Sequence, residues 1–189
     1  MVISMSLFKF KTGLSSKVMA ALIYDNAKTK ASEIEPLFDK MGVIYNEVEN
    51  QLIVMAINYG IMKWELSKSN QKAKVENIIV EVHNRFFSSL KVNTDTIAAY
   101  KDIVKRAEKH VDDILFPLKN QFAEKNRLVY KALLDLQNIH LGLIDRITEQ
   151  EMLITIDNWF AVAKQVNDTY KIEDSKEDLK VETPIDFDF

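Results

Sequence analysis

The sequence predicts an all-α protein, a bundle of five to six mostly antiparallel helices that includes one long helix. Apolar residues recur at spacings of three and four from Leu37 to Leu66, which is typical of one helix face over many turns. The 189 residues include only four glycines and three prolines, too few for a sheet protein with many tight turns. With 47% hydrophobic residues, the chain can form the core of one domain.

The long helix is predicted over residues 33–69. Ser32-x-x-Glu35 has the form of a capping box. Pro36 would then fall in the first turn, where a missing N–H is tolerated. Gly42 and Gly60 each weaken a helix by about 1 kcal/mol relative to Ala, and Gly42 is the favoured position for a break. Nine residues form the apolar stripe, and a second row beside it predicts burial on two sides: Leu37, Met41, Ile44, Val48, Leu52, Met55, Tyr59, Met62 and Leu66, with Ile53, Ile57, Ile61 and Trp64.

Other helices are expected on both sides of this one. Ser15 or Ser16 is a suitable cap for a first helix that ends near Thr29. Apolar periodicity predicts three more helices, over about residues 71–91, 97–114 and 129–147.

The helix ends in the last part of the bundle are predicted from a proline, a capping motif and the apolar periodicity. Pro117 ends or kinks its helix. His140 falls in phase with the apolar stripe of the helix that follows, which predicts a hydrogen-bonded core histidine. Thr148-x-x-Glu151 has the form of a second capping box and would open a last helix that reaches Tyr170. No segment predicts a strand.

Charge divides the chain into three parts, an N-terminal basic and apolar segment, a helical domain and an acidic tail: residues 1–14, 15–171 and 172–189. The net charge is −3, which gives no indication of nucleic-acid binding. Because the chain has no cysteine, signal sequence or long apolar run, we expect a cytoplasmic protein. The tail lacks helical periodicity up to Thr183 and is dense in charge, which is typical of disorder in isolation.

No catalytic residue, cofactor site or metal site is predicted. Glu-x-x-His, the motif of di-metal bundles, occurs at none of the three histidines, His83, His110 and His140. Phosphate-binding glycine loops and a nucleophile elbow are also absent from the sequence. An enzyme or metal-binding bundle remains an alternative, because histidines on different helices could still converge in space.

The tail offers a candidate partner-binding site, which consists of Ile185, Asp186, Phe187, Asp188 and Phe189. Large apolar groups alternate with acids there, so an apolar anchor could enter a pocket while the acids meet basic residues. These last residues resemble the acidic, Phe-terminated tip of bacterial single-stranded-DNA-binding proteins. The resemblance covers about six residues and implies recruitment of a protein partner. Docking of the tail on its own basic N-terminal region is the alternative.

The preferred function is a non-catalytic helical interaction or regulatory protein that acts through a protein partner or by self-association as a dimer. A small-molecule or lipid-binding bundle is an alternative, with an apolar cavity lined by Met55, Tyr59, Met62, Trp64 and Trp159. Residues 1–30 combine apolar and lysine side chains, which is consistent with weak contact to a membrane surface.

Overall fold

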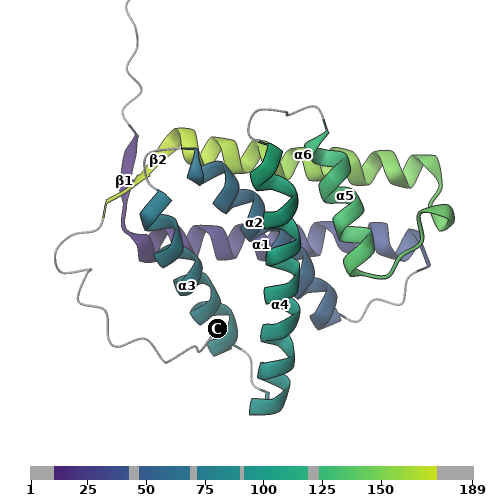
Figure 1. The fold of residues 1–189 in the computed structure, drawn as a ribbon, viewed down its shortest axis with the longest axis horizontal. Coiled ribbons are helices and arrows are strands. Elements are labelled where there is room, and N and C mark those ends of the chain that lie inside the picture. Colours follow the sequence, from purple (N-terminus) through teal and green to yellow (C-terminus); the bar gives the residue numbers. More distant parts are fainter. Residues whose placement is uncertain (1–10, 43–46, 69–71, 90–91, 119–123, 174–189) are drawn as a thin grey trace, which may run out of the picture.

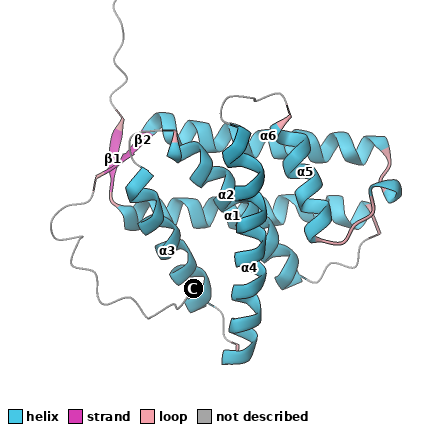
Figure 2. Cartoon of the chain, viewed as in Figure 1, coloured by secondary structure: helices cyan, strands magenta, loops and turns pink. Residues whose placement is uncertain are grey.

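The structure is a computed structural model that describes residues 11–42, 47–68, 72–89, 92–118 and 124–173. Within these ranges the chain is an all-α bundle of six helices with one short pair of strands (Figures 1 and 2). Two single-turn 3-10 helices complete it. The elements in order are β1 Thr12–Leu14, α1 Ser16–Lys40, α2 Glu47–Ser67, α3 Lys72–Ser89, α4 Thr94–Leu115, η1 Phe116–Leu118, α5 Lys125–Leu136, η2 Leu141–Leu143, α6 Arg146–Thr169 and β2 Tyr170–Ile172.

Helix α2 is the centre of the bundle. It packs against α1, α3, α4, α5 and α6, and residues 52–62 form an unbroken buried run. A helix that is apolar on all sides can be stable only when neighbours surround it. The predicted burial of the second apolar row is confirmed, since Ile53, Ile57, Ile61 and Trp64 all lie in the core.

The single long helix predicted over residues 33–69 is wrong, because two helices share that stretch. Helix α1 ends at Lys40, and Gly42 adopts φ 65°, a left-handed conformation that favours glycine and ends helices. Gly42 was the position favoured for a break. The first helix does not stop at Thr29, because Ala31 and Ile34 continue its buried face. Pro36 therefore lies inside α1.

The capping predictions had mixed outcomes. Ser15 caps α1, and its Oγ accepts a hydrogen bond from the Val18 N–H at 3.4 Å. Ser32 caps nothing, because it lies inside α1 and its hydroxyl donates to the Lys28 carbonyl at 3.3 Å. Helix α6 begins at Arg146, and Asp145, not Thr148, is its N-cap.

The helix predicted over residues 129–147 is also shorter than expected. Helix α5 ends at Leu136, because Asn138 adopts φ 56° and the Ile139 N–H donates to the Leu134 carbonyl at 2.9 Å. These are the features of a left-handed helix cap. His140 consequently lies outside the helix and is exposed, so its prediction as a core histidine is wrong.

A short parallel sheet closes one end of the bundle and was not predicted. Strand β1 pairs with β2 in the register Thr12 to Tyr170, Gly13 to Lys171 and Leu14 to Ile172. The Glu173 N–H continues the pairing and donates to the Leu14 carbonyl at 2.8 Å. Strands of three residues are too short to show an alternating pattern in sequence.

Among the described residues, no helix combines the length and the apolar character that crossing a membrane would require.

Candidate functional site

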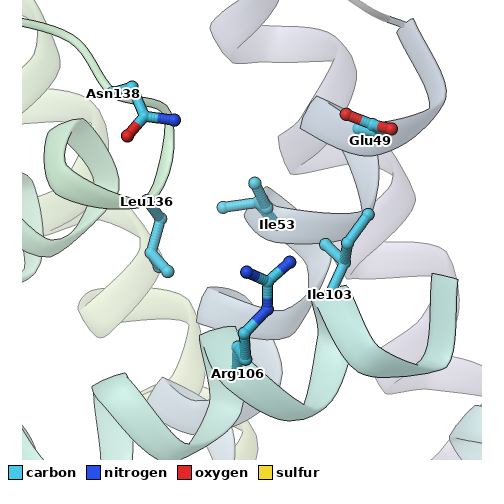
Figure 3. A pocket seen from close by; sticks show the side chains of 6 residues that line it. All are labelled: Glu49, Ile53, Ile103, Arg106, Leu136 and Asn138. Atoms are coloured by element: carbon cyan, nitrogen blue, oxygen red, sulfur yellow. The ribbon is translucent and has the colours of Figure 1, made fainter. Parts of the chain in front are cut away.

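A surface pocket lies where the start of α2, the middle of α4 and the end of α5 meet. Its volume is about 270 Å³. Figure 3 shows the six described residues that line it: Glu49 and Ile53 of α2, Ile103 and Arg106 of α4, Leu136 of α5, and Asn138 just after α5.

Three aliphatic side chains form the apolar part of this pocket. Ile53 is 8% exposed and belongs to the core, whereas Ile103 and Leu136 are half-buried and pack against that core. Because each comes from a different helix, the packing of α2, α4 and α5 holds the surface in place. The pocket can therefore shield an apolar group from water.

Arg106 supplies the positive charge. Its guanidinium rises from α4 toward the space between Leu136, Ile103 and Ile53 (Figure 3). The Nε–H group donates to the Asp102 carbonyl at 3.4 Å. Within the described ranges, the two terminal amino groups have neither a hydrogen bond nor an ion pair. A planar guanidinium with free donors suits a carboxylate, which it can bind through two hydrogen bonds.

The pocket edge is polar. Glu49 and Asn138 are exposed and lie across the pocket from Arg106 (Figure 3). Glu49 and Arg106 form no ion pair with each other in the part of the chain that the structure describes. The left-handed conformation of Asn138 ends α5 at this point, so the helix cap also shapes one wall.

A second polar group is buried between α2, α3 and α4. His83 Nε2 lies 2.6 Å from Glu108 Oε1, and the His83 side chain is only 9% exposed. The Tyr59 ring lies 6.1 Å from the His83 ring, and the Tyr59 hydroxyl has no hydrogen-bond partner among the described residues. Burial, aided by the nearby Tyr24 and by Glu108, raises the pKa of Tyr59 well above its usual value.

This buried group has the residue types of acid–base chemistry, but none of its three members lines the pocket between α2, α4 and α5. The other two histidines lie elsewhere, His110 half-buried on α4 and His140 exposed after α5. In the described ranges, no three histidine or acidic side chains are grouped so that they could hold a metal ion. The contact between His83 and Glu108 links α3 to α4.

The residues predicted to line an apolar cavity lie in the core. Met55, Tyr59, Met62, Trp64 and Trp159 are each at most 4% exposed. None of them lines the described pocket. The predicted partner-binding residues 185–189, and most of the N-terminal segment 1–14, lie outside the described residues.

Sequence reasoning missed all six residues of the pocket as site residues. One signal was available, because an asparagine after an apolar helix is a common left-handed cap, and Asn138 marks where α5 ends. Arg106 gave no such signal, since it is one cation among several on the polar face of α4.

Comparison of the chain with protein-family models, with curated proteins and with solved structures gives no match in any of the three.

Proposed function

We propose that this protein is a non-catalytic helical interaction protein that binds a segment of a protein partner in the pocket between α2, α4 and α5. The segment it would bind presents an aromatic or large aliphatic side chain next to a carboxylate. A cytoplasmic site of action belongs to the same proposal and is supported by the absence of cysteine.

One observation carries the proposal: an arginine whose terminal amino groups have no partner among the described residues stands beside three aliphatic side chains in one pocket. An apolar anchor gains from leaving water, and a neighbouring carboxylate gains charge-assisted hydrogen bonds. Peptide-binding surfaces commonly combine these two contributions, with a buried anchor at the centre and polar groups at the edge.

The size of the pocket favours a side chain over a larger ligand. A cavity of about 150 Å³ is enough to hold benzene. The volume of about 270 Å³ therefore has room for one aromatic ring and part of its neighbours. This volume is slightly below the range for pockets that enclose whole small molecules, which begins at about 300 Å³.

The charges of the pocket favour an acidic segment. Arg106 projects toward the space between the aliphatic side chains, and Glu49 lies at the edge of the pocket (Figure 3); both residues are exposed. Asn138 can both donate to and accept from the backbone of a bound segment. The carboxylate of the ligand is therefore expected at Arg106, with Glu49 as a weaker, opposing charge.

The test uses a capped synthetic peptide, Gly-Asp-Phe-Asp-Gly, and the full-length ¹⁵N-labelled protein. A single anchor with one ion pair should bind with a Kd in the millimolar range, which NMR titration can measure. The expected shifts fall on the amides of Ile53, Ile103, Arg106, Leu136 and Asn138. Peptides with Ala in place of Phe, or Asn in place of both Asp, should bind several times more weakly.

Two charge variants control for non-specific attraction. Arg106→Glu should remove the shifts, whereas Lys109→Glu, which makes the same change of charge one turn along α4 outside the pocket, should retain them. The proposal would be contradicted if both variants lost the peptide-induced shifts equally, or if the shifts were spread over other helices.

A further inference from the structure

We propose that a segment of this same chain, residues 184–189, occupies the pocket in the absence of a partner. Phe187 is the apolar anchor, and one of its two neighbours, Asp186 or Asp188, binds Arg106. This inference rests on the proposed function, because it names an internal competitor for the same site.

The segment has the chemistry that the pocket selects. Phe187 is a benzyl side chain with a carboxylate on each side. Leu179, another apolar residue of the tail, stands between an acid and a lysine and serves for comparison. Phe187 has a larger side chain than Leu179 and two neighbouring carboxylates that could bind Arg106, so it fits the pocket better.

The net charges of the tail and of the middle of α4 are also opposite. Residues 174–189 carry six acids and two lysines. Between positions 101 and 110, α4 carries four cationic side chains against two carboxylates, and one of these carboxylates, Glu108, is held by His83. Attraction between a basic helix surface and an acidic segment increases the rate of encounter, even where each pair is weak.

The tail is long compared with the helices of the bundle. The hydrogen bond from Glu173 to Leu14 holds the start of the tail beside β1. The fourteen peptide steps from Glu173 to Phe187 span up to about 46 Å when extended. Helix α6, with 24 residues, is about 36 Å long. The extended tail is therefore longer than α6, which runs from β2 across the bundle and packs against α5 (Figure 1).

Attachment to the same chain compensates for a weak contact. A flexible tether of this length gives a local concentration of about a millimolar. A segment that binds with a millimolar Kd as a free peptide would therefore occupy a substantial part of the pockets. Any partner must displace the tail. The apparent Kd of the partner therefore equals its intrinsic Kd divided by the fraction of pockets that the tail leaves free.

The test places a spin label on the tail of the full-length protein. The natural chain has no cysteine, so Thr183→Cys gives one site for the label. Docking predicts relaxation enhancement at the amides of Ile103, Arg106, Leu136 and Asn138. The enhancement should persist when labelled protein is diluted with unlabelled, spin-free protein, because the contact lies within one chain.

Two variants locate the contact. Phe187→Ala should reduce the enhancement at the pocket, whereas Leu179→Ala should leave it unchanged. Enhancement that is strongest on α1 or β1, or that does not respond to Phe187→Ala, would overturn the inference.

Peptide affinity separates this inference from the proposed function. If the tail competes, Phe187→Ala should tighten binding of the free Gly-Asp-Phe-Asp-Gly peptide by about twofold to tenfold. Equal affinity for both proteins would reject the internal competitor and leave the proposed function intact. Failure of the peptide to bind either protein would reject the proposed function itself.

Discussion

Gly60 on α2 lies directly against Val111 on α4. A Cβ atom added at Gly60 would stand 2.5 Å from Val111 Cγ1 and 3.0 Å from Val111 Cβ, both closer than normal contact. The absence of a side chain at this position therefore lets α2 and α4 approach closely at the centre of the bundle. This approach matters for the pocket, because α2 and α4 supply four of its six described residues.

Gly60→Ala should destabilise the protein despite the higher helix propensity of Ala. Overpacking costs about 1–3 kcal/mol, whereas the propensity gain is about 1 kcal/mol. We expect a net loss of about 1 kcal/mol in the free energy of unfolding, measured by urea denaturation. Val111→Ala should partly relieve the clash, so the double variant should lose less stability than the two single losses together.

Gly142 is the matched control for this pair. An added Cβ there meets no atom within 4 Å, so Gly142→Ala should be close to neutral. Additive losses at positions 60 and 111 would mean that the close contact does not limit stability.

The pair of His83 and Glu108 should anchor α3. Glu108→Ala leaves the buried His83 ring without its partner at 2.6 Å, which should cost about 1–3 kcal/mol. Hydrogen exchange should accelerate mainly in α3. Asp102→Ala removes an exposed carboxylate from the same helix and should change neither quantity measurably. Faster exchange in α5 or α6 but not in α3 would contradict this role.

The start of α6 should weaken in acid. Hydrogen bonds from the Thr148 backbone and hydroxyl, and then from the Ile147 backbone, lower the pKa of Asp145 below its ordinary value of 3.8. The cap therefore stabilises the folded state fully above that pH, and its contribution is lost as the pH falls through the folded pKa. Asp145→Asn should remove this dependence, measured by amide exchange in the first turn of α6. An unchanged acid profile in that variant would reject the cap as its cause.

Glu49 should oppose the binding of acidic peptides. It lines the pocket opposite Arg106 and is exposed, so its charge contributes about 0.5 kcal/mol. Glu49→Gln should therefore tighten binding of the Asp-Phe-Asp peptide about twofold at low salt, with less change at high salt. Weaker binding in this variant would indicate that Glu49 contacts a donor of the ligand.

Sequence periodicity was sufficient to predict the class of fold and the burial of the second apolar row of α2. Periodicity failed at helix ends, where the conformation of a single residue determines whether the helix stops. Gly42 and Asn138 interrupt apolar stripes that continue in phase on both sides, so a pattern of spacings cannot separate the two helices. The capping boxes failed for a related reason: Ser32 had the right spacing but lies in the interior of α1.

The pocket could not be predicted, because it depends on how three helices cross. The sequence does not distinguish Arg106 from the neighbouring cations Lys105 and Lys109. Nothing along the chain indicates that Arg106 faces Ile53 of α2 and Leu136 of α5. The buried pair of His83 and Glu108 was hidden in the same way, since its members lie on separate helices.

The most direct test of the pocket as a site for acidic segments is charge reversal. The measurement is the Kd of Gly-Asp-Phe-Asp-Gly and of Gly-Lys-Phe-Lys-Gly for the unaltered protein and for Arg106→Glu, in the Phe187→Ala background. We expect the unaltered pocket to prefer the acidic peptide at least about fivefold, which corresponds to about 1 kcal/mol. Arg106→Glu should reverse that preference. Unchanged affinities for both peptides in Arg106→Glu would contradict the role of Arg106 and with it the proposed function.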